Sequence, residues 1–262
     1  MTMRILIVNK FLYLRGGDCV HSLNLKQLLR NAGHDVCFYA MSYSQNIVCE
    51  ENKYFAEEIS FSAKDLQGKI KAASRIIWGI GVVQNFKKLL EEFQPDVVHL
   101  NNIHSYLSPI VAKLAYQRGV KVIWTLHDYK LICPSYSCLC KGNTCEACFT
   151  DKKHVVLRKC MKNSFPASIL AWGEAMNWNK NKLSLWTNSF ICPSQFMAEK
   201  MQQGGYPASK LQVISNFIGE EQVQYIINTP NPIREEAYAY IGRLSQEKGV
   251  ESLLKAASRL PY

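Results

Sequence analysis

Residues 5–31 read ILIVNKFLYLRGGDCVHSLNLKQLLRN. The apolar run Ile5–Val8 predicts a buried strand, and Asp18–Asn31 has the apolar spacing of a helix that stops before Gly33. The turn between them, Arg15-Gly16-Gly17-Asp18, holds two glycines that let a ligand approach the backbone closely, and Asp18 can cap the helix. A plain tight turn is the alternative interpretation, because short glycine motifs are weak signals.

The same alternation of strand and helix continues along the chain. Further strands are predicted at His34–Ala40, Asp96–Leu100, Val120–Leu126, Ser189–Cys192 and Leu211–Ile214. Helices are predicted at 64–93, as one helix or as two joined near Gly79 and Gly81, and at Pro109–Arg118, 165–186 and Gln195–Gln203. This order predicts an α/β fold, with a doubly wound, mostly parallel, Rossmann-type sheet in residues 1–214 that binds ligands beyond the carboxyl ends of its strands.

The last part of the chain predicts a second phosphate-binding unit. Residues 215–236 are interpreted as a linker, and residues 237–262 as the first strand (Ala237–Ile241) and helix of a second Rossmann-type domain. Between that strand and helix lies Gly242-Arg243-Leu244-Ser245-Gln246-Glu247-Lys248-Gly249. A turn of this kind directs backbone N–H groups at an anion, and Arg243 and Lys248 add positive charge suited to a diphosphate.

Charge and composition narrow the class of partner. The 262 residues include 31 Lys and Arg against 21 Asp and Glu, a formal net charge of +10, which favours an anionic partner. Nucleic acid is disfavoured because no recognition helix or RNA-stacking motif accompanies the charge. The apolar run Ile5–Val8 is too short for a secretory signal, and Ile76–Phe86 is shorter than the roughly 18–20 residues that cross a bilayer. We therefore predict a cytoplasmic protein.

Two common nucleotide-binding motifs are missing. The first turn is not G-x-G-x-x-G, and the second strand ends in Ala40-Met41-Ser42, where a dinucleotide fold places an acid for the ribose. No G-x-x-x-x-G-K-[ST] occurs either. NAD binding and a P-loop NTPase are therefore both disfavoured.

Three histidines lie at or near predicted strand ends. His127 directly follows the apolar strand and precedes Asp128, which predicts a position in the ligand crevice. His99 is one residue inside its strand end and is open to interpretation as a hydrogen-bonded core histidine. His104, in Asn101-Asn102-Ile103-His104, is a weaker crevice candidate.

Six of the ten cysteines gather in an insertion at residues 133–160, spaced C-x4-C-x-C-x4-C-x2-C-x11-C. Clustering of this kind in a reducing compartment favours a metal site over a disulfide framework. Cys145 and Cys148 have the spacing of two zinc ligands, and Cys133 with Cys160 could complete a structural Zn²⁺ site, with Cys138 or Cys140 as substitutes. Small buried thiols without a metal are the alternative.

A basic and aromatic segment follows the cysteines. Residues 152–182 hold seven Lys or Arg against one Glu, and Phe165, Ile169, Trp172 and Met176 recur at helical spacing. A helix of this composition suits an anionic membrane surface, which would make the protein peripheral on the inner face of a membrane. The same stripe packed into the domain, with solvated lysines, is an equally weighted alternative.

Taken together, these residues resemble the family 4 glycosyltransferases of the two-Rossmann-domain (GT-B) type. The resemblance runs from Met3 to Leu260, and it rests on the order and spacing of short motifs. These motifs are Ile5-Leu6-Ile7-Val8 with Arg15-Gly16-Gly17, Pro95-Asp96-Val97-Val98-His99, Thr125-Leu126-His127-Asp128, Cys192-Pro193-Ser194-Gln195-Phe196, Val213-Ile214-Ser215-Asn216 and Gly242-Arg243-Leu244 with Glu247-Lys248-Gly249.

The resemblance implies transfer of a sugar from a nucleotide-diphosphate sugar to an acceptor hydroxyl, with retained anomeric configuration and no catalytic metal or other cofactor. The acceptor would be a glycan or a lipid-linked glycan of cell-surface polysaccharide synthesis. Arg243 and Lys248 would hold the donor diphosphate, Gly16 and Gly17 would bring backbone near the phosphate, and His127 would contact the transferred sugar at the reacting centre.

The family carries a complete second domain, with a pair of glutamates that bind the donor sugar and the ribose, whereas residues 237–262 match only its beginning. We therefore expect this chain alone to fold its first domain and to transfer no sugar. The alternative is a non-catalytic remnant that binds an acceptor or a partner protein. A zinc-bearing nucleic-acid binder is the third and least favoured hypothesis.

Overall fold

The computed structural model describes residues 1–61, 65–230, 239–244 and 248–259. A six-stranded sheet with the order β2-β1-β3-β4-β7-β8 forms its centre, and every neighbouring pair in it is parallel. The strands are β1 (Arg4–Val8), β2 (Asp35–Tyr39), β3 (Val97–Leu100), β4 (Lys121–Thr125), β7 (Ser189–Cys192) and β8 (Leu211–Val213). The α/β class and the parallel sheet predicted from the sequence are confirmed.

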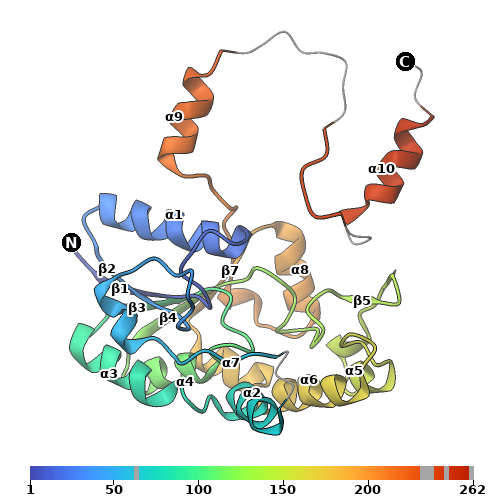
Figure 1. The fold of residues 1–262 in the computed structure, drawn as a ribbon, viewed down its shortest axis with the longest axis horizontal. Coiled ribbons are helices and arrows are strands. Elements are labelled where there is room, and N and C mark those ends of the chain that lie inside the picture. The colour runs from blue at the N-terminus through green and yellow to red at the C-terminus, as the bar shows by residue number, and fades with distance from the viewer. Residues whose placement is uncertain (62–64, 231–238, 245–247, 260–262) are drawn as a thin grey trace.

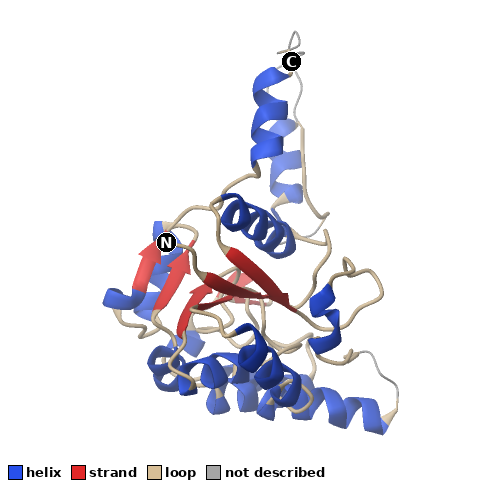
Figure 2. Ribbon diagram, turned by 90° about the vertical axis from the view of Figure 1, so that its left-hand side faces the viewer, coloured by secondary structure: helices blue, strands red, loops and turns tan. Residues whose placement is uncertain are grey.

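Helices cover both faces of this sheet, as Figures 1 and 2 show. One face carries α1 (Gly17–Asn31) and α8 (Gln195–Gln203), and the other carries α3 (Val83–Phe93), α4 (Ile110–Gln117) and α7 (Lys180–Trp186). Because the strands are covered on both sides, they read as continuous apolar runs, and Leu6, Ile7 and Val8 are fully buried. The doubly wound arrangement is therefore built from the predicted elements.

The chain changes direction at β1. It runs from β1 outward to β2 and then crosses back to β3 on the other side of β1, so the loops that follow β1 and β3 leave the sheet in opposite directions. Such a switch point opens a crevice beyond the carboxyl ends of the strands. Both loops were predicted from the sequence to carry ligand-binding residues.

The predicted helical region 64–93 forms two helices, α2 (Leu66–Trp78) and α3. Gly79 ends α2 with φ 71°, and a Cβ at this glycine would lie 2.4 Å from Cγ2 of Ile110. Both the left-handed backbone and the close approach of α4 therefore require glycine, which explains where the helix breaks.

The insertion after β4 has little regular structure. It contains the two-residue strands β5 (Leu139–Cys140) and β6 (Asn143–Thr144) and the short helix α5 (His154–Leu157), and it leads into α6 (Phe165–Asn177). Short 3-10 turns occur here at Ala147–Phe149, and elsewhere at Glu50–Tyr54 and Ala208–Lys210.

The predicted linker and second unit differ from expectation in two places. Residues 215–236 contain a helix, α9 (Glu220–Asn228), which buries none of its residues. The strand predicted at Ala237–Ile241 is not formed in residues 239–241, and its first residues, like 245–247 of the glycine-bounded turn, lie outside the described residues. The predicted helix is present as α10 (Val250–Ala257). Across the described parts of the chain, no helix has the length and apolar character needed to cross a membrane.

Candidate active site

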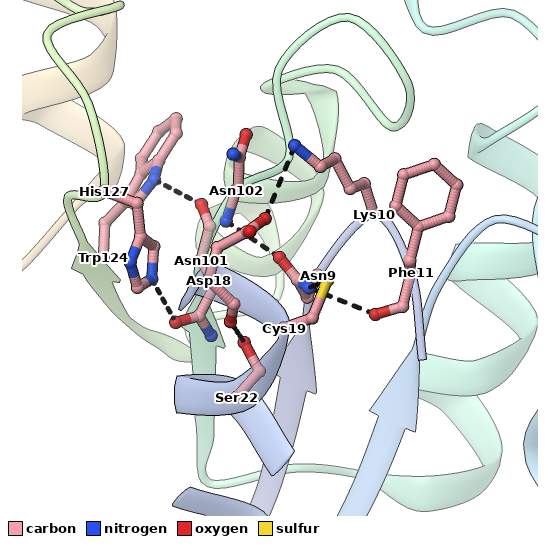
Figure 3. A network of polar contacts seen from close by, with 10 residues as sticks. All are labelled: Asn9, Lys10, Phe11, Asp18, Cys19, Ser22, Asn101, Asn102, Trp124 and His127. Carbon is pink, nitrogen blue, oxygen red and sulfur yellow. Dashed lines mark hydrogen bonds and ion pairs between the residues drawn. The ribbon is translucent and has the colours of Figure 1, made fainter. Parts of the chain in front are cut away.

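The two loops at the switch point are tied together by Asn9, the first residue after β1. Its side chain is fully buried; Oδ1 accepts a hydrogen bond from the backbone N–H of Asn102 at 3.1 Å, and Nδ2 donates to the carbonyl of Phe11 at 3.1 Å. The backbone of Lys10 also donates to the carbonyl of Asn102 at 3.1 Å. These bonds join the loop after β1 to the loop after β3 at the carboxyl ends of the strands (Figure 3).

His127 lies just after β4, at the same edge of the sheet as these two loops. Its Nε2 lies 3.0 Å from Oδ1 of Asn101, and its ring centre lies 5.1 Å from that of His21 on α1. Burial, and then the nearby charge of His21, lower the pKa of His127 to about 4. The ring is therefore neutral at physiological pH, and the position predicted from the sequence, at the crevice, agrees with the structure.

The glycines Gly16 and Gly17 form the start of α1 beside the crevice. Gly16 is the N-cap residue without a side-chain cap, and its φ of −156° is open to any residue. A Cβ on Gly17 would meet no atom of another described residue within 4 Å, beyond its chain neighbours and its own helix. Nothing in the chain itself therefore demands glycine at Gly17, and the backbone there is free for close approach by a ligand.

Asp18 does not cap α1, contrary to the sequence interpretation. The helix begins one residue earlier, so Asp18 lies in its first turn, and its carboxylate forms an ion pair with Nζ of Lys10 at 3.4 Å. A carboxylate in the first turn still interacts favourably with the helix dipole.

Of the other two histidine candidates, His99 packs into the core, while His104 lines a small pocket together with Asn101 and His127. Nε2 of His99 lies 2.8 Å from Oγ1 of Thr125, and burial lowers the pKa of His99 to about 3. His99 is thus the hydrogen-bonded core histidine that the sequence left open. The ring of His104 stacks on Trp124 with centres 5.3 Å apart, and burial lowers its pKa well below the usual value.

Arg243 and Lys248, the predicted diphosphate-binding residues, lie in the segment that leads into α10. Figure 1 shows α10, which begins two residues after Lys248, away from α1. The carbonyl of Arg243 accepts a hydrogen bond from the Tyr240 hydroxyl at 2.6 Å, and Lys248 directly precedes Gly249, the N-cap of α10. Their predicted phosphate contacts stay predictions.

The structure brings several cysteines of the insertion near one another. Hydrogen bonds from the thiols of Cys138 and Cys148 lower the pKa of Cys133, while Nη1 of Arg158 lies 3.0 Å from Sγ of Cys145. In the described residues, no group of three or more candidate ligands has an arrangement that could hold a metal ion. The predicted zinc ligands Cys133, Cys145, Cys148 and Cys160 therefore remain a prediction.

Several residues of the crevice were not singled out from the sequence. Asn9 and Asn101 each directly follow a strand that ends at the switch point, and that position was the available signal. His21 is packed between His127 and Phe217, with ring centres 5.1 and 5.2 Å away. No local pattern indicates His21 or Phe217, because their contacts join segments far apart in the sequence.

Comparison with known families identifies the chain. A model described as Glycosyltransferase Family 4 matches residues 15–222, which include α1, Asn101, His127 and every strand of the sheet after β1. The chain belongs to glycosyltransferase family 4.

This family 4 glycosyltransferase has distant relatives. It is 24% identical over 193 residues to an uncharacterized 42.6 kDa protein in the cps region of Klebsiella pneumoniae, covering 70% of the chain and 44% of that protein. It is 36% identical over 107 residues to an uncharacterized glycosyltransferase of Methanosarcina acetivorans, covering 37% of the chain and 28% of that protein. The chain thus spans less than half the length of these curated relatives.

Among solved structures, a similar one is the apo form of a lipopolysaccharide outer core galactosyltransferase. The similarity covers 99% of the chain and 58% of that protein, with 16% identity and a TM-score of 0.49.

Proposed function

We propose that this glycosyltransferase moves a sugar from a nucleotide-diphosphate sugar to an acceptor hydroxyl with retained configuration, in the synthesis of a cell-surface or lipid-linked glycan. One observation carries the proposal: α1, which begins at Gly17, contacts His127 through His21, with ring centres 5.1 Å apart, and burial keeps the His127 ring neutral by lowering its pKa. Backbone N–H groups at such a helix start suit a phosphate, and a neutral imidazole suits a sugar hydroxyl.

The donor diphosphate needs charge as well as backbone groups. We assign this role to Arg243 and Lys248, which would stabilise the negative charge on the leaving nucleotide from the second domain. Because the chain covers 44% of the first relative, the activity is proposed for a protein that includes the complete second domain.

A lipid-linked acceptor requires access to a membrane surface. Helices α2 and α6 lie side by side, and both leave large apolar side chains exposed, namely Leu66, Ile70, Trp78, Phe165, Ile169, Trp172 and Met176. Exposed lysines flank them at Lys69, Lys71, Lys162, Lys180 and Lys182. We call these two sets together the α2–α6 face, and we propose that it binds anionic lipid headgroups.

The apolar stripe of α6 is thus partly exposed, which favours the membrane interpretation over packing in the core. Trp178 and Trp186, the two tryptophans that follow this stripe, are instead buried, and Nε1 of Trp178 donates to the carbonyl of Ile76 at 2.8 Å. They hold α6 and α7 to the domain.

The test of catalysis is product formation from a panel of nucleotide-diphosphate sugars by the protein with its second domain. We expect His127→Ala to lower kcat/KM by about a hundredfold, the usual scale for loss of one group at a reacting centre. His34→Ala is the matched control, since His34 bonds to the backbone of Met3 and is not part of the crevice. Equal loss in both variants, or no loss in either, would contradict the proposed role of His127.

The non-catalytic alternative predicts a different result. A remnant would bind acceptor glycan without turnover of any donor. Acceptor binding in a calorimetric titration, together with no product from any donor of the panel, would therefore favour the remnant, whereas product formation would exclude it.

A further inference from the structure

We propose that Asn101 is a positioning residue that holds His127 in its Nε2–H tautomer, so that His127 meets the transferred sugar as a hydrogen-bond acceptor through Nδ1. The sugar contact rests on the proposed function, whereas the tautomer does not. The proposal therefore gives the imidazole a definite chemical role at the crevice.

Asn101 is well placed to orient its neighbour because its own position is fixed. Its side chain is 1% exposed, its backbone N–H donates to the carbonyl of Val8 at 2.9 Å, and its carbonyl accepts from Nε1 of Trp124 at 3.0 Å. Its side-chain Oδ1 lies 3.0 Å from Nε2 of His127, as Figure 3 shows. The amide oxygen thus presents an acceptor from a rigid support.

A neutral imidazole carries one N–H and one lone-pair nitrogen, so the partner of one nitrogen sets the role of the other. Burial and the charges of His21 and Lys10 disfavour the protonated ring of His127, whereas Asp18 favours it, and the net effect lowers its pKa. With Oδ1 of Asn101 facing the ring, as in this structure, Nε2 donates, because an amide oxygen only accepts. Nδ1 is then left as an acceptor for a hydroxyl.

A reversed amide would produce the opposite chemistry. In that arrangement Nδ2 of Asn101 would donate to Nε2, and His127 would carry its proton on Nδ1. In the described part of the chain Nδ2 has no hydrogen-bond partner, so the contact with His127 is what decides between the two amide orientations. The tautomer of His127 therefore reports the orientation directly.

The decisive experiment is two-bond proton–nitrogen correlation NMR of the ¹⁵N-labelled chain at pH 7, without any sugar. A His127→Gln variant assigns the signals of His127 among those of the 6 histidines. We expect Nε2 protonated and Nδ1 unprotonated. A ring protonated at Nδ1, or an even mixture of the two tautomers, would overturn the proposal.

Two variants test whether Asn101 is the cause. Asn101→Asp places an anion next to Nε2 and should raise the pKa of His127 by about 1–3 units, the usual effect of a charge at this distance. Asn102→Asp adds the same charge one residue away, on a side chain that Figure 3 shows directed away from His127, and should shift that pKa less. Equal shifts in the two variants would contradict the positioning role.

Asn101→Ala covers the case in which the charged variant does not fold. Loss of the acceptor should leave His127 as a mixture of tautomers, whereas an unchanged tautomer would show that another group sets it. Since no measurement here needs a donor, absence of nucleotide-sugar turnover with the expected tautomer would count against the proposed function and leave the role of Asn101 intact.

Discussion

Two buried histidines near the switch point make the stability of the fold depend on pH. His99 and His127 both have pKa values lowered by burial, to about 3 and about 4. Such groups bind protons in the unfolded chain at a pH at which the folded chain does not, so folding opposes protonation.

The pH dependence of stability follows from that difference. Above about pH 6.5 both states are neutral and the two histidines add no pH dependence. As the pH falls toward 4, the unfolded chain gains protons first, and the free energy of unfolding should drop, on the order of 1–3 kcal/mol for each group. Urea unfolding at pH 7 and pH 5 measures this drop.

Two variants test whether these histidines cause the loss of unfolding free energy at low pH. His99→Asn should reduce it, while His34→Gln, at a residue outside the core, should leave it unchanged. A drop of equal size in wild type and His99→Asn would show that other groups are responsible.

Among the elements, α6 is joined to the loop after β4 by a buried ion pair. Nζ of Lys130 lies 2.9 Å from Oε2 of Glu174, with side chains 8% and 5% exposed, and also donates to the carbonyl of Pro134 at 2.7 Å. The backbone N–H of Lys130 donates to Asp128 next to His127 at 2.8 Å. The helix of the α2–α6 face is therefore linked to the crevice.

Breaking this pair from one side should be costly. Glu174→Gln leaves the Lys130 charge buried without its counterion, and we expect a loss of about 3 kcal/mol in the free energy of unfolding. The double variant Lys130→Met with Glu174→Leu should lose less, because no charge is left unpaired. Glu57→Gln breaks the exposed pair with Lys71 and should cost at most about 1 kcal/mol. Chemical denaturation of the four proteins tests the order.

The cysteine insertion has a small apolar core of its own. Its buried apolar cluster comprises Cys148 and Val155 with Ala171 of α6. Several of its residues and of those just after it take a positive φ although none is glycine, namely Tyr136, Cys138, Lys141, Lys159, Lys162 and Asn163. Left-handed backbone costs roughly 1–2 kcal/mol at each such residue, so a compensating constraint is expected.

We keep structural zinc as that constraint. Cys145, Cys148 and two further thiols of the insertion should bind about one Zn²⁺ per chain, and removing it with a chelator should lower the unfolding temperature. Elemental analysis of reduced, folded protein provides the measurement. Cys148→Ser should lose the metal while Cys49→Ser, outside the insertion, should keep it. A folded wild-type protein with less than about 0.2 zinc per chain would refute the site.

At the scale of the whole molecule, the α2–α6 face and the crevice belong to the same domain. We expect the protein to cosediment with vesicles that contain phosphatidylglycerol and to bind more weakly as salt rises, since screening weakens the contribution of the lysines. Trp172→Ser and Trp78→Ser should each weaken binding about tenfold through lost apolar burial.

Leu28→Ser is the matched control for that experiment. Leu28 is exposed on α1, which covers the opposite face of the sheet, and its replacement should not change vesicle binding. Equal binding to neutral and anionic vesicles, or an equal effect of all three variants, would argue against the α2–α6 face.

The sequence by itself determined the elements of the domain and their order. Apolar runs such as Ile5–Val8 and helical spacing such as Asp18–Asn31 are local properties, so each predicted strand of residues 1–214 occurs within a residue or two of its expected place. The position of His127 was also predictable, because a residue that directly follows a parallel strand must lie at the carboxyl edge of the sheet.

The tertiary structure decided what depends on contacts between distant segments. The bond between Asn101 and His127, the packing of His21 against Phe217 and the exposure of Trp172 have no local signature, since each depends on which elements become neighbours. Periodicity alone showed an apolar stripe on α6, but whether that stripe was buried depended on how far α2 covered it. The chemistry of the crevice therefore depends on the assembled sheet, although the sequence alone predicted that His127 lies at its edge.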